Sequence, residues 1–132
     1  MNAIQKNYLA REVESASPAK LVLMLYDGVL SAIGKAEVEI AAKRVPEAHH
    51  QLIKAQDIVL SLANGLNMEA GGSIAQSLYL LYDFIYDALV RANLNKDSEP
   101  LQKIKEILIT IRDAWDDGVV QGKPPPVSVE AA

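Results

Sequence analysis

The sequence predicts an all-α fold, an antiparallel up-down four-helix bundle preceded by a short helical segment. Apolar residues recur with the 3.6-residue period of a helix over four long blocks, and proline and glycine separate these blocks. The connections are short, so neighbouring helices should run antiparallel. No stretch shows the two-residue alternation of a strand bounded by turn residues. At 132 residues, half of them hydrophobic, the chain is the size of one domain with a real core.

Proline opens the first two long helices. Ser17-Pro18 places a capping serine before a proline at the first helical position, which predicts a helix from Pro18 to about Lys43. Val45-Pro46-Glu47 opens a second helix, which should end within Gly65-Leu66-Asn67. Glycine and asparagine there tolerate the left-handed conformation that terminates many helices.

Two further helices follow, and a weaker one comes before the others. Gly71-Gly72-Ser73 opens a third helix that runs to about Asn93. Asp97-Ser98-Glu99-Pro100 caps a fourth, which ends near Gly118. A short helix is expected over roughly Ala3 to Glu12, because its few apolar residues cannot support a long one.

The expected organisation is one bundle with an extension at each end. Pro124-Pro125-Pro126 lies among small residues, a composition typical of a disordered tail. We therefore expect an N-terminal segment over residues 1–16, which is a short helix or a groove cover, the bundle over 17–119, and the tail over 120–132.

Composition excludes several classes of function. The formal net charge is −4 and no basic cluster stands out, which argues against nucleic acid and anionic membrane surfaces as partners. Cysteine is absent, which removes disulfides, thiolate metal sites and a cysteine nucleophile. The N-terminus does not resemble a signal peptide, and the longest apolar run is far too short to span a membrane. We expect a cytoplasmic protein without membrane insertion.

No residue pattern indicates catalysis, a cofactor or a metal. His49-His50 are adjacent on a helix, so their side chains point about 100° apart and cannot share a metal ion. Asp113, Asp116 and Asp117 lie together without the Glu-x-x-His pairs of a di-iron bundle, which disfavours a metallo-bundle enzyme. Gly71-Gly72 lacks the lysine and hydroxyl residue of a phosphate loop. The sequence predicts a protein that is not an enzyme.

The second helix carries more apolar residues than a core-facing stripe requires. Ile53 and Leu60 lie about a third of a turn off that stripe, on the same face as Asp57 and Asn64. The residues that form the predicted core stripe are Leu52, Ala55, Val59, Leu62 and Leu66.

The third helix has a second apolar stripe, and the fourth has one apolar residue off its core face. Tyr79, Tyr86 and Val90 form that second stripe, with Tyr82 between them. Ile109 on the fourth helix also points away from the core. Leu80 and Phe84 make a further patch on the third helix, unless that helix is buried all round. The predicted core stripes contain Ile74, Leu78, Leu81, Ile85, Leu89 and Ala92 on the third helix and Leu101, Ile104, Leu108, Ile111 and Trp115 on the fourth.

A row of apolar residues at i and i+7 beside tyrosines is typical of a groove for an amphipathic helix. The row predicts a surface that holds another protein, or the seam of a homodimeric helical scaffold without a client. Tyr26-Asp27-Gly28 also resembles a motif. For it we expect a tyrosine hydroxyl at the bundle edge, an exposed aspartate, and a glycine where two helices approach closely.

Seven segments, in order and with matching spacing, resemble the FliS family of flagellar secretion chaperones. Each segment is weak alone, but together they are specific, and they cover the chain up to about Trp115. Tyr8 also matches the leading tyrosine of that family. The segments are Ser17-Pro18, Lys20-Leu21-Val22-Leu23-Met24-Leu25-Tyr26-Asp27-Gly28, Lys54-Ala55-Gln56-Asp57-Ile58-Val59, Leu66-Asn67-Met68-Glu69-Ala70-Gly71-Gly72, Leu81-Tyr82-Asp83-Phe84, Ala92-Asn93 and Arg112-Asp113-Ala114-Trp115.

The resemblance implies a chaperone that binds the disordered C-terminal region of flagellin in the bacterial cytoplasm. Binding would block premature polymerisation and deliver the subunit to the gate of the flagellar type III export apparatus. Asp57 and Asn64 would hydrogen-bond the client, and Tyr8 would be a movable plug in the empty groove. The expected client-binding residues are Tyr8, Ile53, Asp57, Leu60, Asn64, Tyr79, Tyr82, Tyr86, Val90 and Ile109.

Overall fold

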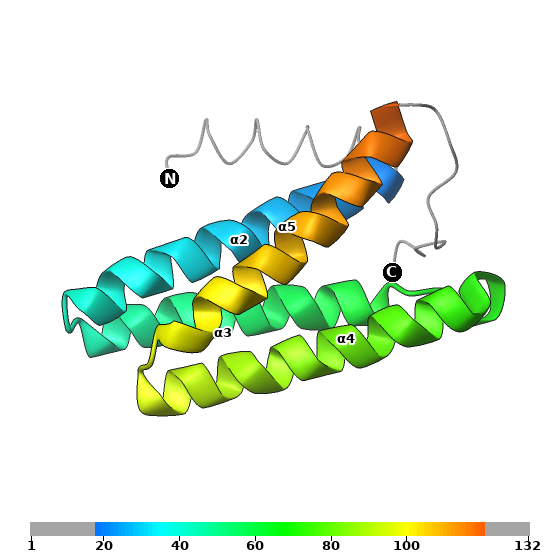
Figure 1. Ribbon diagram of the computed structural model, residues 1–132. Helices are drawn as coiled ribbons and strands as arrows, with labels where there is room; N and C mark the ends of the chain where they lie inside the picture. Colours follow the sequence, from blue (N-terminus) through cyan, green and yellow to red (C-terminus); the bar gives the residue numbers. More distant parts are fainter. Residues whose placement is uncertain (1–17, 121–132) are drawn as a thin grey trace, which may run out of the picture.

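A computed structural model describes residues 18–120 of the chain, with side chains to Asp117. All four elements in this range are α-helices, and they form a bundle (Figure 1). The predicted all-α class is therefore confirmed. Tyr8, the expected N-terminal helix and the expected tail lie outside the described residues. The four helices are α2 (Pro18–Ala41), α3 (Val45–Asn64), α4 (Met68–Asn95) and α5 (Glu99–Val120).

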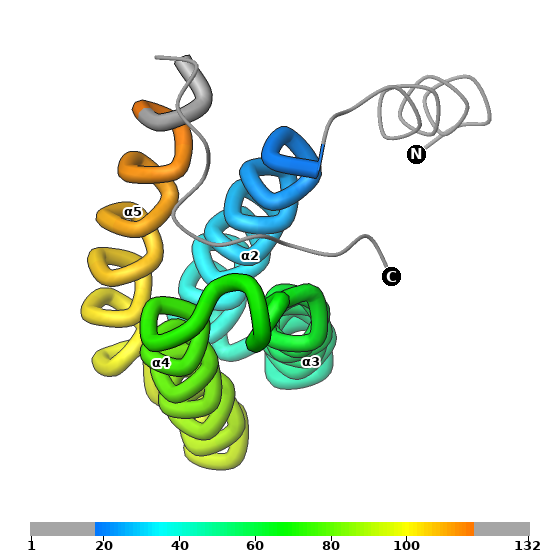
Figure 2. The backbone as a smooth tube through the Cα atoms, turned by 90° about the vertical axis from the view of Figure 1, so that its right-hand side faces the viewer, coloured from blue at the N-terminus to red at the C-terminus, as the bar shows by residue number. Residues whose placement is uncertain are grey.

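Helices α2 and α3 form the most extensive helix–helix contact of the bundle. Helix α2 contacts both α3 and α5, and α4 packs mainly against α3. Helices α4 and α5 have the least mutual contact of these neighbouring pairs. They diverge from the loop that joins them, and the C-terminal half of α5 lies beside the N-terminal half of α2 (Figures 1 and 2). Among residues 18–120, the bundle is thus open along the side of α4 from which α5 diverges.

The helix ends differ in part from the sequence expectation. Gly65 has φ −81°, in the right-handed region, so the left-handed end expected for the second helix is wrong. Asn67 instead caps α4, because its side-chain oxygen accepts a hydrogen bond from the backbone N–H of Ala70 at 2.9 Å. Left-handed residues occur at Lys43 and Lys96, which follow α2 and α4. Short polar turns rather than glycine therefore end these two helices.

Helix α4 begins earlier than predicted. It starts at Met68, and Gly72 breaks its regular geometry with φ 55° and ψ −132°. The segment Met68–Gly71 is a first turn that meets the rest of the helix at an angle. Glycine is suited to this position because residues that carry a side chain rarely adopt this backbone conformation. The glycines that predicted a helix start therefore mark a kink within the helix.

The core follows the predicted stripes closely on α3 and α5 but not on α4. Leu66 and Ile111 are only half-buried, yet both pack against the core. On α4, Ile74 is 49 % exposed, so its predicted core position is wrong. Because α5 diverges from this half of α4, none of the described helices covers the side that Ile74 occupies. Ala75 and Tyr82 are the buried residues there instead.

Candidate partner-binding site

A surface pocket of about 200 Å³ lies between α3 and α4. Leu60 and Tyr79 line it from opposite helices and are 41 % and 47 % exposed. Asn64 and Asp83 add polar groups to the same lining. The structure thus brings five of the predicted residues together in one place. The full lining is Val59, Leu60, Ala63, Asn64, Tyr79, Tyr82, Asp83 and Tyr86.

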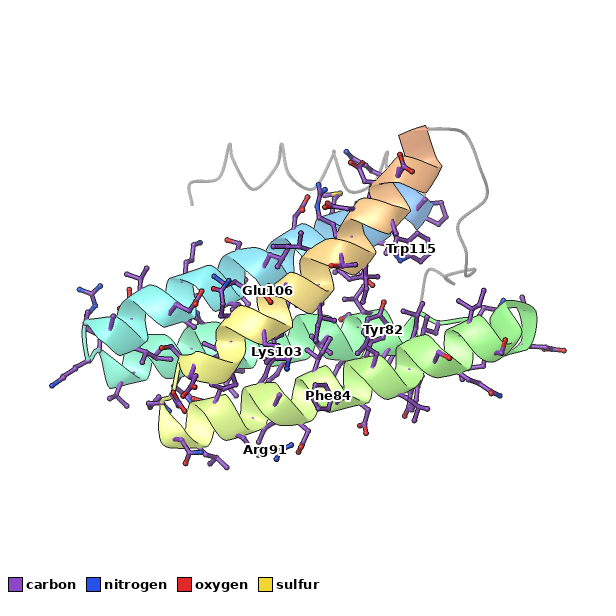
Figure 3. All side chains as sticks on the ribbon, in the orientation of Figure 1. Tyr82, Phe84, Arg91, Lys103, Glu106 and Trp115 are labelled. Carbon is purple, nitrogen blue, oxygen red and sulfur yellow. The ribbon has the colours of Figure 1, made fainter. Side chains whose placement is uncertain are left out.

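Tyr82 lines this pocket as a buried residue. Its side chain is only 2 % exposed, so the prediction that it lies on the outer stripe with Tyr79 and Tyr86 is wrong in that respect. Tyr82 belongs to the core and forms the buried part of the pocket lining, whereas Tyr79 is on the surface. Figure 3 shows Tyr82 on the central part of α4, at the side that faces the other helices.

A second pocket, of about 320 Å³, is lined by residues of α3 on the other side of its exposed ridge. Ile53 and Asp57 line this second pocket, whereas Leu60 and Asn64 line the first. The four residues of the predicted row are exposed and form a ridge on α3, but they are divided between the two pockets. The described lining residues of the second pocket are His50, Ile53, Lys54, Asp57, Ile58 and Ser61.

Two predicted residues lie apart from both pockets. Val90 is half-buried on α4 and follows Tyr86 by about one helical turn. Ile109 is 44 % exposed on α5, a helix that contributes no lining residue to either pocket. Both remain predicted client contacts, but neither lines the pocket that Leu60 and Tyr79 share.

Tyr26 is the residue whose role the sequence expectation missed. It is fully buried in α2, so the expected position at the bundle edge is wrong. Its hydroxyl hydrogen-bonds the hydroxyl of Tyr82 across the core. Burial raises the pKa of both phenols above the ordinary value, so both remain neutral. The helical spacing could have predicted this burial, because Tyr26 lies in register with the core residues Val22, Val29 and Ile33.

The other two residues of the same motif behave as expected. Asp27 is exposed and pairs with Arg112 of α5, whose Nε lies 2.5 Å from an Asp27 carboxylate oxygen. Gly28 allows α2 to approach α3, since a Cβ built on it would lie 3.3 Å from Cδ1 of Ile58. A second ion pair between α5 and α2 joins Lys105 to Glu37 at 2.5 Å.

The histidines and the acidic residues have separate surroundings. Nδ1 of His49 lies 3.0 Å from the side-chain nitrogen of Asn93, whereas His50 lines the second pocket. Asp113 and Asp116 surround the guanidinium of Arg112. Within residues 18–117, no group of three metal-ligating side chains is placed to hold a metal ion. None of the described helices is long and apolar enough to cross a membrane.

A helical bundle with an apolar, tyrosine-lined pocket between two of its helices has the features of helical proteins that bind other proteins. Comparison with known proteins gives the particular class. The chain belongs to the FliS family, because the family described as flagellar protein FliS matches residues 1–122. FliS is a family of flagellar secretion chaperones and not of enzymes.

Several curated relatives match most of the chain, each named flagellar secretion chaperone FliS. The Vibrio cholerae protein is 34 % identical over 116 residues, which is 88 % of this chain and 85 % of the relative. The Salmonella typhimurium protein is 38 % identical over 104 residues, or 78 % and 77 % of the two chains. The Bacillus subtilis protein is 34 % identical over 120 residues, or 89 % of each.

Proposed function

We propose that this chain is a cytoplasmic export chaperone that binds the disordered C-terminal region of flagellin in the pocket between α3 and α4. Binding prevents premature polymerisation, and the complex is delivered to the flagellar type III export apparatus. The observation that carries the proposal is the pocket itself. A member of a flagellar secretion chaperone family exposes Leu60 and Tyr79 beside each other at a cavity lined by two helices.

The composition of the pocket suits a client that folds as it binds. A disordered segment loses conformational entropy on binding, so its partner must offer apolar area to offset that loss. Tyr79 and Tyr86 provide large rings with few rotatable bonds, which limits the entropy lost on the chaperone side. Asn64 can hydrogen-bond the client backbone and fix its register.

Residues on the neighbouring ridge and in the N-terminal segment complete the proposal. Ile53 and Asp57 extend the contact surface along α3 toward the second pocket. Tyr8, within the segment 1–16, covers the groove when no client is bound. The tail over residues 120–132 has no role in this proposal.

A charge placed in the pocket tests the proposal. Leu60→Asp puts a carboxylate where the client would bury it, which should weaken binding of a flagellin C-terminal peptide by at least about tenfold. Leu60 is exposed in the free chain, so the helical content and the cooperativity of melting should stay unchanged. Leu94→Asp is the matched control, because Leu94 is 78 % exposed on α4 and lines neither pocket. Titration calorimetry with both variants gives the comparison.

Two results would contradict the proposal. Equal binding of the peptide by Leu60→Asp and Leu94→Asp would show that the client does not use this pocket. A wild-type chain that forms a stable dimer and does not bind flagellin would support the alternative of a homodimeric scaffold. The mass of the purified chain, alone and with flagellin that has or lacks its C-terminal region, distinguishes these cases.

A further inference from the structure

Tyr82 connects the pocket to the interior of the bundle. Its ring lines the cavity between α3 and α4, yet only 2 % of the residue is exposed. Its hydroxyl points inward and hydrogen-bonds the hydroxyl of Tyr26, with the two ring centroids 6.5 Å apart. One face of the pocket is therefore a core side chain, and its position depends on a contact made with α2.

Tyr26 is itself held on more than one side. It is fully buried, and Trp115 of α5 is buried in the same core cluster. Figure 3 labels Trp115 on the C-terminal half of α5, the half that lies beside α2. Three helices thus meet through Tyr26, Tyr82 and Trp115. The Tyr26 hydroxyl joins α2 to α4 through its hydrogen bond with Tyr82.

We propose that Tyr26 is a positioning residue for the pocket, because its hydroxyl keeps the Tyr82 hydroxyl inside the core and so holds the Tyr82 ring as the pocket floor. Without that partner, Tyr82 has a buried hydroxyl with an unmet hydrogen bond, which is strongly unfavourable. The ring already lines a surface pocket of about 200 Å³, which offers the hydroxyl a route to water. Rotation of the ring toward water fills this pocket and competes with the client.

Three variants test the proposal with the flagellin peptide as probe, so this readout rests on the proposed function. Tyr26→Phe should bind the peptide about three- to tenfold more weakly, since only the fraction of chains with an open pocket binds. Adding Tyr82→Phe removes the hydroxyl that would otherwise lack a hydrogen-bond partner in the core. The double variant should therefore bind the peptide more tightly than Tyr26→Phe alone. Tyr82→Phe by itself is the reference for the ring without its hydroxyl.

The expected rescue separates positioning from a merely structural role. Every variant, the double variant included, lacks the hydrogen bond between the hydroxyls of Tyr26 and Tyr82. The free energy of unfolding should therefore stay below that of the wild type in the double variant, while affinity recovers. If Tyr26→Phe binds the peptide like the wild type, or if the double variant binds no better than Tyr26→Phe, the proposal is wrong.

A readout without a client keeps the inference separate from the proposed function. Isotope-labelled tyrosine allows nuclear magnetic resonance contacts to be measured from the Tyr82 ring to Leu60, which lines the same pocket. These contacts should strengthen in Tyr26→Phe and return toward the wild-type pattern in the double variant. An unchanged ring position in Tyr26→Phe overturns the inference, even if flagellin binding fails for every variant.

Discussion

Residues 26 to 28 connect α2 to each of the other three described helices. Tyr26 reaches Tyr82 on α4, Asp27 pairs with Arg112 on α5, and Gly28 allows contact with Ile58 on α3. Consecutive residues on a helix point about 100° apart, so three of them can face three different neighbours. This short stretch therefore fixes where α3, α4 and α5 stand around α2.

Gly28 and Gly34 offer a matched pair for measuring how tight the α2–α3 contact is. An added Cβ at Gly34 meets nothing within 4 Å, so Gly34→Ala should raise the free energy of unfolding by about 0.5–1 kcal/mol through helix propensity. At Gly28 the same gain is reduced, because Cδ1 of Ile58 lies 3.3 Å away and must shift.

Ile58 is half-buried and lines the second pocket, so its end has room to move. Gly28→Ala should therefore be stabilising by less than Gly34→Ala, with a net change between zero and about 1 kcal/mol. Urea unfolding at constant slope measures both variants. A loss of more than about 1 kcal/mol for Gly28→Ala would show that this contact is rigid.

At the scale of single residues, the sequence predicted which side chains are exposed better than it predicted which side chains hydrogen-bond each other. Ile53, Leu60 and Ile109 are exposed as the helical spacing indicates. Tyr82 was misplaced because its angular position lies close to the edge of the core stripe, where small rotations of the helix decide burial. The bond between Tyr26 and Tyr82 joins residues 56 positions apart, and no local pattern encodes such a pair.

At the scale of elements, α4 carries the largest departure from regular geometry. Gly72 has φ 55° and ψ −132° inside the helix, between the capped first turn and the long remainder. The glycine pair in the sequence indicated a helix boundary, and the structure has a kink there. Asn67, expected to end the second helix in a left-handed conformation, is instead the N-cap of α4.

Gly72→Ala should lower the free energy of unfolding by about 1–3 kcal/mol, because alanine is strained in that backbone conformation. An added Cβ at Gly72 meets nothing within 4 Å, so the loss would come from the backbone and not from a clash. Gly34→Ala is the control for a helical glycine with equal open space. Thermal and urea unfolding compare the two, and an unchanged Gly72→Ala protein would mean that the kink is not required in solution.

At the scale of the whole molecule, the direction of α5 decides which predicted core residues are covered. Trp115 and Leu108 are buried against α2 as the spacing predicts. Ile74 is exposed because α5 turns away from the N-terminal half of α4. Helical periodicity tells which face of a helix is apolar, but it does not tell how far a neighbouring helix extends along that face. The fold class was therefore predictable, and the open side of α4 was not.

The two buried phenols give the whole bundle a defined sensitivity to alkali. Burial raises the pKa of Tyr26 and Tyr82 in the folded state above the ordinary value of about 10. Above about pH 10 the unfolded chain loses these protons while the folded chain keeps them, so the folded state binds more protons and stability falls as pH rises. Below about pH 10 both states are protonated, and this contribution is fully present.

The free energy of unfolding should therefore drop between about pH 10 and about pH 11.5 by up to about 1.4 kcal/mol per pH unit for each tyrosine. The double variant Tyr26→Phe/Tyr82→Phe lacks both phenols and should lose stability less steeply over the same range. Urea unfolding at a series of pH values measures the slopes. Parallel slopes for the wild type and the double variant would show that the two phenols titrate alike in the folded and unfolded chains, which would contradict their burial as a hydrogen-bonded pair.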